Sequence, residues 1–272
     1  MKKLLLPVLL VFISFNSYAE KTVSGLYLKQ SAGGSYNPIG VLITTHLFYR
    51  VPLIKKDGIL WESSKIDLGF HNDLSPAFEN PGLFIQIEPI AIFDCKFQIN
   101  RVHLYKQLGF GYISLDSASS SYSPDSIKDR SQSSNNGYWI KVAPTLKLMI
   151  KKMIIANTFS FNSITMDKNG YYVERLTNTC LDNDDILLAN DILTLYEFSK
   201  SFIAGANYYS NRVQSTGAAT HRLSLAAIYA HEFSSKTDFN SVILAGTYFK
   251  HDFLTWKDPY IALQLEISYK FR

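Results

Sequence analysis

The chain has 272 residues and a net charge of +4, which falls to +2 without the two lysines nearest its N-terminus. This balance gives no case for a nucleic-acid-binding protein, and its two cysteines, Cys95 and Cys180, form neither a disulfide framework nor a zinc-site spacing. Aromatic residues make up 14% and charged residues 18%, a combination that suits a surface facing lipid as well as a tightly packed β-sandwich.

The first 19 residues predict an exported protein. Lys2 and Lys3 form a positive start, residues 4–13 are an apolar run, and small residues follow up to Ala19. This is the layout of a secretory signal peptide, with cleavage expected between Ala19 and Glu20. The run is shorter than the ~20 apolar residues that cross a bilayer, although an uncleaved anchor is the alternative.

Twelve later segments are predicted as β-strands, because apolar and polar residues alternate along most of them. In chain order they are 22–30, 39–51, 60–70, 83–89, 93–105, 138–150, 153–166, 191–198, 202–212, 221–233, 241–253 and 261–272. The alternation is clearest in the second, third, sixth and last of these. Pro144 lies inside the sixth and lacks a ladder N–H, so a bulge is expected there.

The connections between these segments are predicted to alternate in length. Mostly short links are 55–58, 90–92, 151–152, 199–201 and 234–240, whereas longer polar links are 31–38, 71–81, 109–137, 168–190, 214–220 and 252–259. Transmembrane barrels have short periplasmic turns and longer outer loops. The rhythm therefore predicts an even number of strands, with both termini in the periplasm.

The closing segment gives a resemblance to a known class. Its ending is similar to the C-terminal β-signal of bacterial outer-membrane barrels, with Gln264, Tyr269 and Phe271 at the matching positions. Glu266 stands where that signal commonly has glycine, and Arg272 follows the aromatic residue that is usually last. The resemblance implies an all-β, antiparallel up-and-down transmembrane β-barrel of about 12 strands, formed by residues 20–272 as a single domain.

The same resemblance sets the expected surroundings. Such a barrel lies in the outer membrane, contacts its lipid and lipopolysaccharide, and depends on barrel-assembly and periplasmic chaperone machinery. No nucleic acid partner, cofactor or metal site is expected, because the six histidines have no metal-ligand spacing.

The polar phase of the strands predicts which side chains line the lumen if the apolar phase faces lipid. These are Arg50, Lys65, Asp67, Glu88, Lys96, Lys141, Lys147, Arg222, Glu266 and Lys270. Basic residues exceed acidic ones in this set, which favours a passage for anions. The alternative is a ladder of compensated ion pairs that fills a narrow barrel. Aromatic residues near strand ends predict interfacial girdles, namely Tyr49, Tyr138, Tyr208, Tyr229, Tyr248, Tyr269 and Trp256.

Two further groups of residues have side chains of the kind found in catalytic or metal sites. His71, with Asn72 and Asp73, has the side-chain types of a hydrolytic site near a loop mouth. The run 182–185 carries carboxylates that could bind calcium, but it lacks the glycine and distal glutamate of an EF-hand, so a solvated loop is expected.

Three functions remain open at this point. The first is a narrow channel, or a structural barrel that displays surface loops. The second is an outer-membrane lipid hydrolase of the phospholipase or lipid A deacylase type. The third is a soluble periplasmic β-sandwich that binds a ligand.

Overall fold

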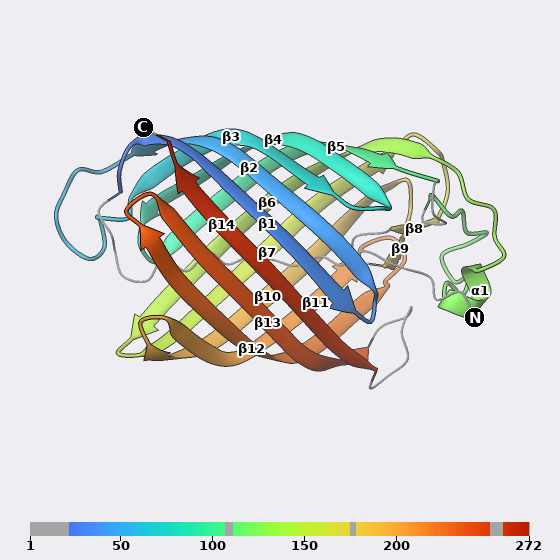
Figure 1. Cartoon of the computed structure of the whole chain (residues 1–272). Coiled ribbons are helices and arrows are strands. Elements are labelled where there is room, and N and C mark those ends of the chain that lie inside the picture. The colour runs from blue at the N-terminus through green and yellow to red at the C-terminus, as the bar shows by residue number, and fades with distance from the viewer. Residues whose placement is uncertain (1–21, 107–110, 175–177, 251–257, 272) are drawn as a thin grey trace.

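The computed structural model describes residues 22–106, 111–174, 178–250 and 258–271, and over these ranges the chain forms a closed barrel of twelve antiparallel strands (Figure 1). The barrel strands are β1 (Gly25–Tyr36), β2 (Gly40–Pro52), β3 (Lys65–Leu74), β4 (Phe78–Ile90), β5 (Phe93–Leu104), β6 (Asn135–Ile150), β7 (Met153–Met166), β10 (Asp184–Ser199), β11 (Phe202–Val213), β12 (Ala219–Ser234), β13 (Thr237–Lys250) and β14 (Pro259–Lys270). Each pairs with its neighbour along the chain, and β1 pairs with β14 to close the barrel. The predicted fold class is confirmed, and the β-sandwich hypothesis is wrong.

Each predicted segment corresponds to one barrel strand, and β7 has the predicted bounds. Several strands are longer than predicted. β1 continues to Tyr36 and β10 begins at Asp184, so the predicted links 31–38 and 168–190 were too long. Ser31 and Asp185 look like loop residues in the sequence, but both are buried inside the barrel. A polar residue on the inward phase of a strand is therefore easily mistaken for part of a loop.

The two ends of the barrel differ. At one end, on the left of Figure 1, β14 ends and residues 53–64 connect β2 to β3. We call this the turn end. The other end, the loop end, carries β8 (Tyr172–Glu174), β9 (Thr179–Leu181) and α1 (Pro124–Ile127). The predicted alternation of link lengths is partly wrong, because the loop-end connections 37–39 and 75–77 are tight turns whereas 53–64 at the turn end is long.

The predicted bulge at Pro144 is also wrong. Val142 pairs with Phe161 and Thr145 pairs with Thr158 in the same register, so β6 and β7 continue past the proline without an extra residue. The proline interrupts the ladder locally but does not shift it.

The outer surface of the barrel is apolar. Leu68, Leu83, Leu148 and Leu225 all point outward, and Leu225 is 72% exposed. Strands of 10 to 16 residues are long enough to cross a bilayer when tilted. A continuous apolar belt around a closed barrel is the surface that lipid covers. Among the described residues, no helix has the length and apolar character needed to cross a membrane.

Part of the predicted aromatic girdle lies on the outer surface of the barrel. Tyr49, Tyr138, Tyr229 and Tyr269 are exposed on the outer surface. Tyr248 is buried inside the barrel, because it lies on the inward phase of β13 and its ring packs against Tyr260 at a centroid distance of 5.8 Å. Trp256 lies outside the described residues.

Candidate functional site

Charged side chains on β2 to β6 form a network on the inner wall near the turn end. We call this the ion-pair belt, and it comprises Arg50, Lys65, Asp67, Glu88, Asp94 and Lys147. Arg50 and Asp67 are register partners and make two hydrogen bonds of 2.7 Å each. Such bidentate guanidinium–carboxylate pairs are among the strongest hydrogen-bonded contacts in proteins.

The rest of the belt is joined through shared carboxylates. The Nζ atom of Lys65 lies 3.0 Å from Glu88, its register partner on β4. Lys147 lies 3.3 Å from Glu88 and 2.6 Å from Asp94. Every charge in the belt therefore has a partner of opposite sign, which offsets the cost of removing it from water.

A second chain of contacts lies on the inner wall beyond the belt. Thr44 Oγ1 donates to Asp73 at 2.5 Å, and the other carboxylate oxygen lies 3.0 Å from His71 Nε2. His71 Nδ1 lies 2.9 Å from His46 Nε2, which also accepts from Lys96 Nζ at 3.0 Å. An ammonium can only donate, so His46 Nε2 is an acceptor and His71 Nδ1 must be a donor.

Three inward-facing cations differ from those of the belt. Among the described residues, no carboxylate oxygen lies within 4.0 Å of Lys96, Lys141 or Arg222, and we call these the unpaired cations. Lys141 Nζ lies 5.9 Å from the centre of the Trp139 ring. The guanidinium of Arg222 lies over the Tyr260 ring, at 4.0 Å from its centre, and its Nε atom is buried without a hydrogen-bond partner.

Another part of the inner wall carries an apolar cluster. It lies on β10 to β13, with Leu195, Ile203, Ile228 and Leu244 all buried together. The same strands also carry the buried charges of Asp191 and Arg222, so apolar and charged groups share this part of the wall.

The hairpin of β8 and β9 caps part of the loop end. Tyr172 and Leu181 are fully buried, and they pack with inward-facing residues from the loop-end halves of the barrel strands, such as Phe78 and Val213. The Tyr172 ring stacks on Tyr112 at 5.0 Å. Burial, followed by the charge of the Glu174 carboxylate, raises the pKa of Tyr172 well above its ordinary value. This hairpin was not predicted from the sequence, although the run 171–173 is an aromatic and β-branched segment inside a polar link.

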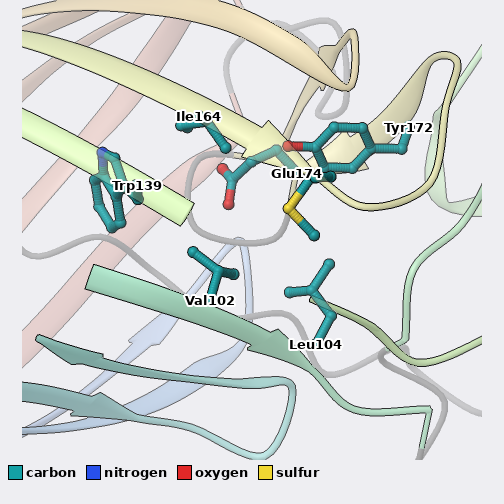
Figure 2. Close-up of a pocket in the computed structure, with 7 residues that line it drawn as sticks. Val102, Leu104, Trp139, Ile164, Tyr172 and Glu174 are labelled. Carbon is teal, nitrogen blue, oxygen red and sulfur yellow. The ribbon is translucent and has the colours of Figure 1, made fainter. Parts of the chain in front are cut away.

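A small cavity lies beneath the cap. Figure 2 shows Glu174 and Tyr172 with Trp139, Val102 and Leu104 around it. Its volume is about 10 Å³. That is roughly the volume in which one water molecule fits. The cap therefore fills this part of the loop end.

The structure gives a place to every residue of the predicted lumen set. Five of them belong to the ion-pair belt, namely Arg50, Lys65, Asp67, Glu88 and Lys147. Lys96, Lys141 and Arg222 are the unpaired cations. Glu266 forms an ion pair with Lys29 at 2.9 Å, and Lys270 Nζ lies 6.0 Å from the centre of the Tyr27 ring. That this set lines a conducting lumen stays a prediction.

Several charged residues of the inner wall were not predicted from the sequence. Asp94 and Asp191 are buried acids, Lys29 pairs with Glu266, and His46 contacts Lys96. Asp94 shares its inward phase with Lys96 two residues later, a signal that was present in the alternation. With Lys29, Asp94 and Asp191 included, the set has eight basic and five acidic residues, against the predicted seven and three.

The residues of the hydrolase hypothesis are divided between two faces of β3. His71 and Asp73 are buried together inside the barrel, whereas Asn72 has the opposite phase and donates to Glu79 at 3.2 Å. In the described part of the chain, the side-chain partners of His71 are His46 and Asp73. Neither is a serine, threonine or cysteine, whose activation by a neighbouring base is the usual arrangement.

The acidic run 182–185 has a structural use. The Asp185 carboxylate accepts backbone N–H bonds from Asp182 at 3.0 Å, from Ile186 at 2.8 Å and from Ser215 at 3.2 Å. It thereby ties the start of β10 to the connection after β11. No cluster of three or more His, Cys, Asp or Glu side chains suited to a metal ion occurs among the described residues.

The residues of the predicted insertion signal lie on β14 and just after it. Gln264 is buried inside the barrel, whereas Tyr269 points outward. The Phe271 N–H donates to the Leu26 carbonyl at 2.9 Å, and its ring lies 5.1 Å from that of Tyr269. Their role in assembly stays a prediction. The predicted cleavage site at Ala19 and Glu20 lies outside the described residues.

Solved structures with a similar fold are outer-membrane barrels. The β domain of the Bordetella autotransporter BrkA has a TM-score of 0.50 at 7% identity, covering 92% of this chain and 100% of that one. The translocator domain of the autotransporter NalP from Neisseria meningitidis has a TM-score of 0.47 at 12% identity, covering 92% and 90%. The KdgM porin has a TM-score of 0.43 at 8% identity, covering 90% and 99%.

No protein-family model matches the chain, and no curated protein matches it. At these identities the structural likeness concerns the fold alone. Together with the closed topology and the apolar outer belt, it shows that the chain has the fold of outer-membrane β-barrels.

Proposed function

We propose that the protein is a narrow outer-membrane channel for small polar solutes. The observation that carries this proposal is the group of unpaired cations on the inner wall. A charge without a partner is very costly in a dry interior, so Lys96, Lys141 and Arg222 favour an interior that contains water. Water beside a wall of charged groups supplies the environment that a polar solute needs to cross the membrane.

The same interior would keep such a passage narrow. The ion-pair belt, the apolar cluster on β10 to β13 and the β8–β9 cap all reduce the open cross-section. The cap also favours a second candidate, a structural barrel that displays its loop-end residues outside the cell. The second hypothesis of the sequence, a lipid hydrolase, has less to favour it, because the side-chain partners of His71 among the described residues are His46 and Asp73, and neither is a serine.

Single-channel recording tests the proposal. The folded protein, verified by heat-modifiable gel migration, is added to a planar bilayer in potassium chloride. We expect discrete conductance steps, and larger ones for Tyr172→Ser, which removes a fully buried ring from the cap. Ser119→Ala, an exposed change in another connection at the loop end, is the control and should match the wild type. If neither the wild type nor Tyr172→Ser conducts, the channel proposal is wrong and the structural barrel is preferred.

We also propose the route by which the protein reaches the membrane. A signal peptide cleaved between Ala19 and Glu20 would direct export, and Gln264, Tyr269 and Phe271 would engage the barrel-assembly machinery after periplasmic chaperones deliver the chain. Lipopolysaccharide would contact the part of the barrel that lies in the outer leaflet. Mass spectrometry of the mature protein should give Glu20 as the first residue, and Phe271→Ala should lower the amount in the outer membrane.

A further inference from the structure

We infer that Lys96 and Lys141 form a binding site for a small anion on the inner wall. The two lysines lie on neighbouring strands, β5 and β6, which run side by side in the barrel wall (Figure 1). Lys96 is the register partner of Ala143, and Lys141 is the register partner of Gln98. The lysines are therefore diagonal neighbours on the same face, a relation in which long side chains reach one another.

The charges around the two lysines leave a positive excess. The carboxylates whose fields reach them are Asp73, Asp94 and Asp191. Asp73 is held by His71 and Thr44, and Asp94 is paired with Lys147 at 2.6 Å.

Asp191 is the remaining carboxylate, and its side chain accepts a hydrogen bond from Asn207 at 2.5 Å. It faces Lys141 and Arg222, so two unpaired cations act on one carboxylate that forms no ion pair with a basic side chain among the described residues. Of the other basic groups near Lys96, Lys29 is neutralised by Glu266 at 2.9 Å. His46 is occupied as an acceptor between Lys96 and His71.

The contrast with the ion-pair belt explains why an external anion is needed here. In the belt, each cation has a carboxylate within 3.3 Å. Lys96 contacts a histidine nitrogen and lies over the Phe84 ring, and Lys141 lies near the Trp139 ring. Both side chains remain partly accessible from the interior. An anion between the two ammonium groups would contact both, and would relieve the repulsion between them.

The chemistry of the site sets the class of ligand. Lysine presents a point charge with rotatable donors, and it lacks the planar fork that makes arginine selective for oxyanion geometry. The site should therefore select by charge and accept halides, phosphate or carboxylates of small size. This inference rests on the proposed channel only for access to the site, because binding itself can be measured without transport.

Trp139 gives a probe of the site, since its ring lies 5.9 Å from Lys141 Nζ. The experiment uses the full mature protein in detergent, with the other two tryptophans, Trp61 and Trp256, replaced by Phe. Iodide is an anionic quencher of tryptophan fluorescence and caesium is a cationic one. We expect iodide to quench Trp139 about tenfold more strongly than caesium at equal ionic strength, with saturation that marks binding.

Variants decide whether the two lysines cause the effect. Lys141→Gln and Lys96→Gln should each reduce the iodide preference several-fold, and Lys141→Arg should retain it. Lys152→Gln removes the same charge from the exposed turn after β6, and should leave the preference unchanged. Unsaturable quenching, or an iodide preference that persists in both glutamine variants, overturns the inference. A protein that binds iodide in this way but never conducts keeps the site and loses the channel.

Discussion

Replacing Asp67 with Asn removes one partner of the best-formed ion pair inside the barrel. The Arg50 and Asp67 side chains are 17% and 5% exposed, and two bonds of 2.7 Å join them. Two unit charges about 4 Å apart attract by roughly 4 kcal/mol at an effective dielectric constant of about 20. Breaking such a pair leaves a buried guanidinium without its counter-charge, a loss of ~3–5 kcal/mol in comparable cases.

We therefore expect Asp67→Asn to lower the free energy of unfolding by about 3 kcal/mol, slightly less than the full pair attraction because the asparagine oxygen still accepts one bond. Urea unfolding in detergent micelles, followed by tryptophan fluorescence, measures this change. The double variant Arg50→Gln/Asp67→Asn should lose less than the sum of the two single variants, because the remaining charge is then gone.

The matched control is Asp116→Asn. Asp116 pairs with Arg130 at a similar distance of 2.9 Å, but its side chain is 84% exposed. Exposed pairs contribute ~0–1 kcal/mol, so this change should have little effect. If Asp67→Asn lowers the free energy of unfolding no more than Asp116→Asn does, charges on the inner wall are screened as they are in bulk water. The ion-pair belt would then not be shielded from solvent, and the expected loss would be refuted.

Three other predictions concern packing, stability at the loop end and pH. A Cβ atom on Gly205 would lie 2.0 Å from the Thr194 carbonyl oxygen, so Gly205→Ala should reduce the heat-modifiable folded fraction at least several-fold. Gly34→Ala, where the nearest atom is at 3.4 Å, should fold normally. Phe78→Ala removes a fully buried ring and should cost ~3–5 kcal/mol in urea unfolding; a loss below about 1 kcal/mol would show that the loop-end cluster is loosely packed. Burial and a hydrogen bond to Glu79 raise the pKa of Tyr105 to about 12. Its phenolate absorbance should therefore appear near pH 12, the stability it adds should be lost between about pH 10 and pH 12, and an unshifted titration would contradict the contact.

The β8–β9 cap and the unpaired cations both bear on how a solute would cross the barrel. A cap that packs an aromatic pair into the loop end would restrict entry, whereas unpaired cations farther inside would attract an anion that has entered. The two features together favour slow, charge-selective passage over free diffusion. Measuring the conductance and the anion preference of the Tyr172→Ser and Lys141→Gln variants separates the effect of the cap on entry from the effect of the lysine on selectivity.

The sequence by itself determined the strands and the class of barrel. Side chains alternate between two faces in any extended strand, so β7 and the closing strand were recognisable from residue order alone. The apolar phase of Leu263 and Leu265 indicated a surface that avoids water. These features are local, since each depends only on residues a few positions apart.

The tertiary structure decided the content of the interior. Glu88 and Lys147 are 59 positions apart, yet they meet on the inner wall. Tyr248 and Tyr229 look equivalent in the sequence, but one is inside the barrel and the other outside. The reason is that barrel closure, strand register and the inward fold of the β8–β9 hairpin are set by contacts between distant segments. Which charges are paired, and which have no carboxylate partner, follows only from that arrangement.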